Sequence, residues 1–354
     1  MAVEISKLLN MLIERNGSDL HLGANTPPHI RIDEKLVPVD KTVLSELEVK
    51  DLVYGLLSPK EIEKFEQQRE LDRSFEVKGL SRFRMNVFFQ RGVIGSAIRA
   101  IPFKILSFAE CGLPVKVITE LSRRPKGLVL VTGATGSGKS TTLASIVDKI
   151  NDERPCHIIT IEDPIEFVHK NKLAVIDQRE VGSDTMSFPQ ALKHVLRQDP
   201  DVILIGEMRD LETIEAALTI AETGHLVFAT LHTSDAVQTV NRIIDVFPSH
   251  QQQQVRTQLS FILLGILSQQ LIPKVGGTGR TLCCEVLVAT PAVRSMIREK
   301  KVHQIASIVQ TGQKEGMKTM NQSIYDLYVQ KHISYEEAIS RSTDQDDLIR
   351  LFKR

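Results

Sequence analysis

The sequence contains a glycine-rich pattern of the kind that binds phosphate. Residues 128–142 read LVLVTGATGSGKSTT, an apolar run followed by Gly-x-x-x-x-Gly-Lys-Ser and then a helix-like segment. Glycines at this spacing let backbone N–H groups surround phosphate oxygens, and the N-terminus of the following helix adds its dipole. We therefore predict an ATP site whose nucleotide-binding residues are Gly133, Ala134, Thr135, Gly136, Ser137, Gly138, Lys139, Ser140 and Thr141. Lys139 would neutralise phosphate charge, and the Ser140 hydroxyl would bind Mg²⁺ directly.

Acidic residues follow a second apolar run, in IITIEDPIEF at residues 158–167. Hydrolysis of ATP requires a group that orients a water molecule or takes its proton. Glu166 lies just beyond the predicted strand, after a proline that bends the chain, and we predict that it is the general base. Glu162 and Asp163 are expected to support it. Each acid taken alone would more often be a solvated carboxylate or half of an ion pair.

The third apolar run, in DVILIGEMRD at residues 201–210, ends in Gly206 and Glu207. Many nucleotide hydrolases have an aspartate near this point that helps to hold Mg²⁺. Because Mg²⁺ commonly keeps several waters, we predict that Glu207 contacts it through water, and that Gly206 leaves room for a close approach to the ligand. The alternative interpretation is an ion pair between Glu207 and Arg209.

Two histidines bracket the apolar run of GHLVFATLHTSDA, residues 224–236. His225 and His232 are seven residues apart, so on a strand they would point to opposite faces, which argues against a shared metal ion. If the strand ends near Thr230, His232 lies in the loop at the carboxyl edge of the sheet, where ligands bind in such folds. A lone histidine is otherwise more often a structural hydrogen-bond partner.

These motifs require a sheet that brings the ends of several strands together. Strongly apolar runs separated by helix-like segments indicate a mainly parallel sheet covered on both faces. Before them, alternating runs and helical spacing indicate a small α+β domain, with a turn near Asp33 and Glu34 and a linker containing Pro102 and Phe103. We predict an α/β fold in four parts: an α+β domain at 1–100, a linker at 101–112, a P-loop ATPase domain at 113–290 and a helical region at 291–354.

The composition restricts the possible functions further. The chain has 354 residues, 42% of them apolar, and its 44 basic and 44 acidic residues give a net charge of zero. Without a basic tail or stripe, no nucleic acid is expected as a partner. No run approaches the roughly 20 apolar residues of a membrane span, and FILLGIL at 261–267 is interpreted as one face of a buried helix. The four cysteines form no C-x-x-C pair, so we predict free thiols, Cys283 and Cys284 facing opposite ways in a strand, and a cytoplasmic protein.

The four motifs, together with GSDLHL at 17–22, RFRMN at 82–86 and TPAVRSMIRE at 290–299, resemble the secretion ATPases of the type II secretion and type IV pilus superfamily. The chain looks most like the ATPases that retract type IV pili in twitching motility, and this resemblance covers essentially its whole length. It implies a PAS-like N-terminal domain, a RecA-like ATPase domain and a homohexamer. It also implies peripheral association with the inner membrane, where the partner would be the pilus platform protein.

The resemblance also implies roles for particular residues. The catalytic glutamate of the family matches Glu166. The histidine motif matches as well, which gives His232 the role of a γ-phosphate sensor and His225 that of a coupling or interface residue. In a ring, arginines of a neighbouring subunit can stabilise charge on the transferred phosphoryl group. Three arginines of the N-terminal domain are candidates for this action in trans: Arg82, Arg84 and Arg99.

Three alternatives remain open. Extension motors and type II secretion ATPases belong to the same superfamily, but they usually have a longer N-terminal region and many carry a four-cysteine zinc insertion. The chain begins almost directly at the PAS-like domain and lacks such cysteine pairs, so retraction is expected. A RecA-like nucleic-acid translocase is disfavoured by the neutral charge. A nucleotide-switched scaffold without hydrolysis is disfavoured by the set of acids.

Overall fold

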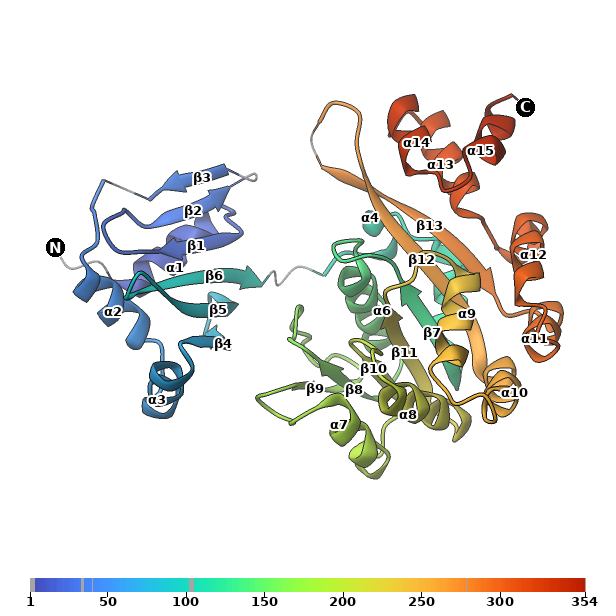
Figure 1. Cartoon of the computed structure of the whole chain (residues 1–354), viewed down its shortest axis with the longest axis horizontal. Coiled ribbons are helices and arrows are strands. Elements are labelled where there is room, and N and C mark those ends of the chain that lie inside the picture. Colours follow the sequence, from blue (N-terminus) through green and yellow to red (C-terminus); the bar gives the residue numbers. More distant parts are fainter. Residues whose placement is uncertain (1–3, 33–34, 40, 102–104, 278, 354) are drawn as a thin grey trace. The chain divides into compact units, whose positions relative to one another are not determined.

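The computed structural model describes residues 4–32, 35–39, 41–101, 105–277 and 279–353. The chain forms two compact units, divided between Lys104 and Ile105, and Figure 1 shows their elements. The expected turn at Asp33 and Glu34 and the expected linker residues Pro102 and Phe103 lie outside the described residues.

The N-terminal unit contains a six-stranded antiparallel sheet in the order β3-β2-β1-β6-β5-β4. The core residues alternate along these strands: Phe83, Met85 and Val87 of one strand are completely buried, as expected when one sheet face is covered. The alternating runs of the sequence form these strands, and the last three of them along the chain make an antiparallel meander. The strands of the sheet are β1 (Asp19–Leu22), β2 (His29–Ile32), β3 (Lys35–Pro38), β4 (Glu70–Val77), β5 (Ser81–Gln90) and β6 (Val93–Ile101).

In its described residues this unit also contains the helices α1 (Ile5–Glu14), α2 (Glu46–Tyr54) and α3 (Pro59–Gln68). Serines begin the second and third helices. Ser45 and Ser58 each accept a hydrogen bond from the backbone of a glutamate three residues on, whose side chain bonds back to the serine N–H. This reciprocal pair satisfies two backbone donors at a helix start, and the pair at Ser58 begins α3 as a helix separate from α2.

The larger unit contains a seven-stranded sheet in the order β13-β12-β7-β11-β10-β8-β9. All neighbours are parallel except β12 and β13. The three central strands β7, β11 and β10 are buried at every position, which explains their continuous apolar runs. The strands are β7 (Gly127–Thr132), β8 (His157–Glu162), β9 (Val175–Glu180), β10 (Val202–Ile205), β11 (Leu226–Leu231), β12 (Leu263–Pro273) and β13 (Arg280–Val288).

Helices cover both faces of this sheet. On one face lie α4 (Phe108–Cys111), α5 (Val115–Ser122) and α6 (Lys139–Glu153). The other face is covered by α7 (Phe188–Val195), α8 (Leu211–Glu222), α9 (Ala236–Asp245), α10 (Gln252–Ile262), α11 (Pro291–Arg298) and α12 (Ile305–Thr311). The predicted two-sided parallel sheet is thus confirmed.

The prediction of a helix for residues 261–267 is wrong. Helix α10 ends at Ile262, and the next residues begin β12, which runs parallel to β7. A short apolar run fits a buried strand as well as a buried helix, so periodicity could not separate them. Glycine is needed at position 265 of this strand, because a Cβ there would lie 2.9 Å from the carbonyl oxygen of Leu287.

The chain beyond residue 290 is helical, as predicted, and ends in α13 (Met320–Val329), α14 (Tyr335–Arg341) and α15 (Gln345–Phe352). Cys283 packs with these last helices, whereas Cys284 packs in the core on the other side of β13. The opposite orientation of the two thiols is therefore confirmed, and all four cysteines are free. Within the described residues, no helix combines the length and the apolar character needed to cross a membrane.

Candidate active site

A pocket of about 580 Å³ opens at the carboxyl ends of the parallel strands of the larger unit. The predicted phosphate loop forms one wall, and residues that follow β8, β10 and β11 form the others. The lining includes Thr135, Gly136, Gly138, Lys139, Ser140, Thr141, Glu162, Asp163, Glu166, Glu207, Arg209 and His232. The structure therefore gathers acids from two strand ends and one of the two histidines around a single cavity.

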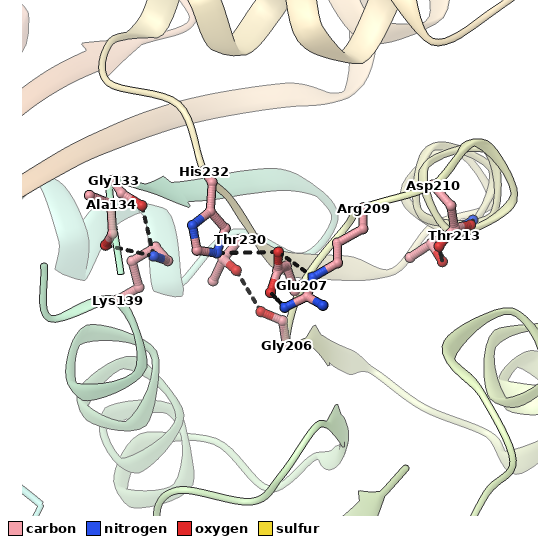
Figure 2. Close-up of polar contacts among 10 residues, drawn as sticks. All are labelled: Gly133, Ala134, Lys139, Gly206, Glu207, Arg209, Asp210, Thr213, Thr230 and His232. Atoms are coloured by element: carbon pink, nitrogen blue, oxygen red, sulfur yellow. Dashed lines mark hydrogen bonds and ion pairs between the residues drawn. The ribbon is translucent and has the colours of Figure 1, made fainter. Parts of the chain in front are cut away.

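The phosphate loop depends on glycine at its first position. Gly133 has φ 142°, and a Cβ there would collide with the Gln269 carbonyl oxygen and with Ser137. The Lys139 Nζ donates hydrogen bonds to the carbonyl oxygens of Gly133 (2.7 Å) and Ala134 (3.0 Å), as Figure 2 shows. Burial lowers the pKa of Lys139. Helix α6 (Lys139–Glu153) begins at this lysine, and Ser140 and Thr141 of its first turn also line the pocket. The N-terminus of the helix therefore lies at the pocket, where it favours an anion.

Glu207 lies between the side chains of Arg209 and His232 (Figure 2). The Arg209 guanidinium contacts both of its carboxylate oxygens, at 2.6 and 2.7 Å, and His232 Nε2 lies 3.2 Å from Oε1. Burial disfavours the Glu207 carboxylate, but the hydrogen bond from Arg209 and the positive charges of Arg209 and Lys139 outweigh this effect and lower the pKa of Glu207. The ion pair considered as an alternative for Glu207 is therefore present, and it lies inside the pocket.

Gly206 permits a close approach of two backbone segments, because it lies directly against the neighbouring strand β8. Its N–H donates to Ile161 O at 2.8 Å, and an added Cβ would lie 3.2 Å from the Glu162 Cα. On its other side, Gly206 O accepts a 2.5 Å hydrogen bond from Thr230 Oγ1. A side chain at position 206 would therefore push β10 away from β8. Position 206 has no room for an acidic side chain, and the acid that follows β10 is the next residue, Glu207.

The chain that follows β8, residues 163–169, has no regular secondary structure. It carries Glu166, whose exposed side chain borders the pocket. The peptide bond between Asp163 and Pro164 is cis. Glu162, at the end of β8, accepts hydrogen bonds from Thr160 Oγ1 (2.7 Å) and Gln178 Nε2 (3.1 Å). Burial nevertheless raises the pKa of Glu162.

The two predicted histidines lie at opposite ends of β11. His232 follows the strand and lines the pocket, whereas His225 precedes the strand and does not line it. The His225 Nδ1 lies within hydrogen-bond distance of Ile220 O (3.2 Å) and Thr223 Oγ1 (3.3 Å). His225 therefore cannot contact a ligand in this pocket together with His232, and its coupling role stays a prediction.

Sequence reasoning missed residues that line the pocket or hold its walls. His169 lines it, its Nδ1 is buried without a hydrogen-bond partner, and burial lowers its pKa to about 4. Arg280, at the start of β13, lines the pocket as well. Gln178 on β9 bonds to the segment that carries Glu166. None of these three belongs to a motif with recognisable spacing, and only the packing of strands brings them to the site.

The three candidate arginines belong to the N-terminal unit. Arg84 of β5 lies directly opposite Arg99 of β6 in the sheet, and Arg82 lies opposite Ile101. Arg99 Nε donates a 2.8 Å hydrogen bond to the buried Asp19. The guanidinium of Arg84 is 4.0 Å from Asp72.

The pocket has the groups needed to bind and hydrolyse a nucleoside triphosphate. The backbone loop and Lys139 suit phosphate oxygens, and Glu166 offers an exposed carboxylate for a water molecule. The Ser140 hydroxyl and the Glu207 carboxylate are oxygen donors, the kind of ligand that Mg²⁺ prefers when substrate phosphates and waters complete its shell. These residues fit that ion, although both oxygens of Glu207 are already paired with Arg209.

Comparison with known proteins identifies similar chains. Residues 102–340 match the family model of type II/IV secretion system proteins. A Pseudomonas aeruginosa protein named type IV pilus retraction ATPase PilT is 48% identical over 95% of this chain and 97% of its own length. A Neisseria gonorrhoeae twitching motility protein is 46% identical over 97% and 91%. A solved structure of the pilus retraction motor PilT with bound ADP superposes with a TM-score of 0.93, at 50% identity, over 98% of this chain and 99% of that one.

Proposed function

The chain belongs to the family of type II/IV secretion system proteins, and we propose that it is the ATP-hydrolysing motor that retracts type IV pili in twitching motility. The family membership and the fold predicted from the motifs are confirmed. The observation that carries the proposal is the convergence of the phosphate loop, Glu166, Glu207 and His232 on one pocket, in a chain similar to retraction ATPases over nearly its whole length.

In the proposed reaction, ATP binds with its phosphates on the loop and Lys139. Glu166 orients the attacking water and accepts its proton, and His232 contacts the γ-phosphate. Bound Mg²⁺, held by Ser140 and through water by Glu207, would neutralise charge on the phosphate oxygens. The Arg209–Glu207–His232 contacts connect the acid after β10 to the loop after β11, so a change at the γ-phosphate reaches two strand ends.

We also propose that six copies of the chain form a ring and act on the platform protein of the pilus at the inner membrane. Nucleotide bound where one subunit meets the next would fix the arrangement of their units, and product release would relax it. Arginines of the N-terminal unit would then complete the site of a neighbour. A pilus-extension or type II secretion ATPase is the alternative within the same family.

Deletion of the gene in its host tests the direction of the motor. Surplus surface pili that do not retract are expected for a retraction motor. Loss of surface pili would contradict retraction and indicate extension. The different class of function, a nucleic-acid translocase, predicts ATPase activity that DNA stimulates and salt weakens, so equal turnover with and without DNA would exclude it.

A further inference from the structure

The segment between β8 and β9 carries Glu166 but has no secondary structure of its own. Its backbone N–H and carbonyl groups therefore need partners elsewhere, since unpaired buried groups are costly. Most of the sheet presents apolar side chains to its neighbours. Strand β9 differs, because it directs two polar side chains at this segment, Gln178 and Glu180.

The Gln178 amide makes two hydrogen bonds to this segment and one to Glu162, the last residue of β8. Its Oε1 accepts from the N–H of His169 at 2.8 Å. Its Nε2 donates to the carbonyl oxygen of Phe167 at 2.8 Å and to Glu162 Oε1 at 3.1 Å. An amide offers two donors and one acceptor oxygen, so both of its ends are engaged on a single short stretch of chain.

Glu180 holds the same stretch from two residues further along the strand. Its Oε2 accepts a hydrogen bond from the N–H of Ile165 at 3.1 Å, and its side chain is buried. Residues two apart on a strand share a face. The residues on both sides of Glu166, Ile165 and Phe167, are therefore each bonded to a side chain of β9.

We propose that Gln178 is a positioning residue for ATP hydrolysis, which holds the 162–169 segment so that Glu166 faces the nucleotide. This inference rests on the proposed function, because it assigns the effect of Gln178 to Glu166. A purely structural anchor is the competing interpretation. Asn151 is such an anchor in the next stretch, where its amide bonds to Lys170 O and Lys172 N.

Steady-state ATPase kinetics of the full-length protein separate the two interpretations. We expect Gln178→Ala to lower kcat by about tenfold to hundredfold, because a displacement of about 1 Å at a reacting group can have an effect of that size. The KM for ATP should stay within about twofold, since the phosphate loop is untouched. Gln178→Met, which fills the space without hydrogen bonds, should give the same result. It replaces the alanine variant in this test if that variant does not fold.

The matched control is Asn321→Ala. Asn321 is a buried amide of the same unit that bonds to Asp344 O and Asp347 Oδ2 among the C-terminal helices, at 2.8 Å each. Its removal should lower thermal stability by an amount similar to that of Gln178→Ala while kcat stays at the wild-type value. A kcat at the wild-type level in folded Gln178→Ala or Gln178→Met, or an equal loss of kcat in Asn321→Ala, would overturn the positioning role.

A double variant tests whether Gln178 acts through Glu166. If it does, Gln178→Ala combined with Glu166→Gln should be no slower than Glu166→Gln alone, because residues that act as a unit are not additive. Multiplied losses would overturn the inference and leave the proposed function intact. The proposed function itself fails in a different way, namely if the wild-type protein releases no phosphate from ATP.

Discussion

His232 Nε2 lies 3.2 Å from Glu207 Oε1, so the residue after β11 contacts the acid after β10 inside the phosphate pocket. Arg209 forms an ion pair with the same carboxylate from the other side. Glu207 is therefore placed by two neighbours before any ligand arrives. Its lowered pKa keeps it ionised at neutral pH, and an ionised carboxylate is the form that can attract a cation or water on a cation.

Replacement of Glu207 by Gln should raise the Mg²⁺ concentration needed for half-maximal ATPase activity by about tenfold, because one charge that favours the hydrated ion is lost. The side chain keeps its size and a hydrogen-bond acceptor, so folding should be retained. ATPase rates across a Mg²⁺ titration measure this. Glu215→Gln, at an exposed position of α8, is the control. A wild-type Mg²⁺ requirement in Glu207→Gln would remove Glu207 from the ion.

Glu166→Gln should bind ATP with unchanged affinity and turn it over at least about a hundredfold more slowly, because the amide cannot accept the proton of the attacking water. Fluorescent-nucleotide binding and phosphate release measure the two quantities separately. Asp163→Asn, three residues earlier in the chain and in the same pocket, should have the smaller effect. Turnover at the wild-type rate in Glu166→Gln would refute its role as general base.

Lys139→Ala should reduce ATP turnover by at least about a hundredfold, since it removes the cation that faces the phosphates. Lys149→Ala is a matched control on the same helix, because that lysine pairs with Glu153 away from the pocket. Phosphate release and nucleotide binding should both be measured. Intact turnover in Lys139→Ala would contradict the assignment of the phosphate loop.

His169 makes stability depend on pH in a predictable direction. Burial lowers its pKa from 6.5 to about 4, so between these values the unfolded chain binds a proton that the folded chain does not. Its contribution to stability is therefore complete above pH 6.5 and is lost as the pH falls toward 4. At about 1.4 kcal/mol per pKa unit, the full loss is about 3 to 4 kcal/mol.

His169→Gln should flatten this dependence. Chemical denaturation at several values between pH 7 and pH 4 gives the free energy of unfolding for wild type and variant. The exposed His250, replaced by the same residue, is the control and should follow the wild-type curve. An equal decline in His169→Gln and wild type would show that other groups cause the loss of stability.

The sequence predicted the parts of the site that depend on local spacing. The phosphate loop, the acids after β8 and β10, and His232 all follow strands whose apolar runs are unambiguous, and parallel strands place their carboxyl ends at one edge. Gln178 and His169 were not predicted as residues of the site, because their roles come from contacts between a strand and a loop, and such contacts have no fixed spacing in the sequence. The helix predicted at 261–267 failed because seven apolar residues suit either structure. The pilus function came from resemblance and not from periodicity or charge.

Arg84 and Arg99 lie directly opposite each other on β5 and β6. Like charges in opposed positions destabilise a sheet, and here Asp19 balances Arg99 at 2.8 Å, whereas Asp72 is 4.0 Å from Arg84. Removal of Arg99 would deprive the buried Asp19 of its nearer cationic partner, since Arg31 is 4.0 Å away, and would disturb the unit. Arg84 is therefore the cleaner residue with which to test action in trans.

Mixing subunits provides that test. Arg84→Ala alone and Lys139→Ala alone should each have little ATPase activity. If Arg84 acts on a neighbour, a mixed ring contains interfaces in which an intact Lys139 meets an intact Arg84. With equal, random mixing, about a quarter of the interfaces of a closed ring would be complete, so activity should return to about a quarter of wild type. Arg82→Ala and Arg99→Ala, mixed in the same way, compare the other two candidates. Rings of normal size with no recovered activity in the Arg84→Ala mixture would show that Arg84 does not act across the interface.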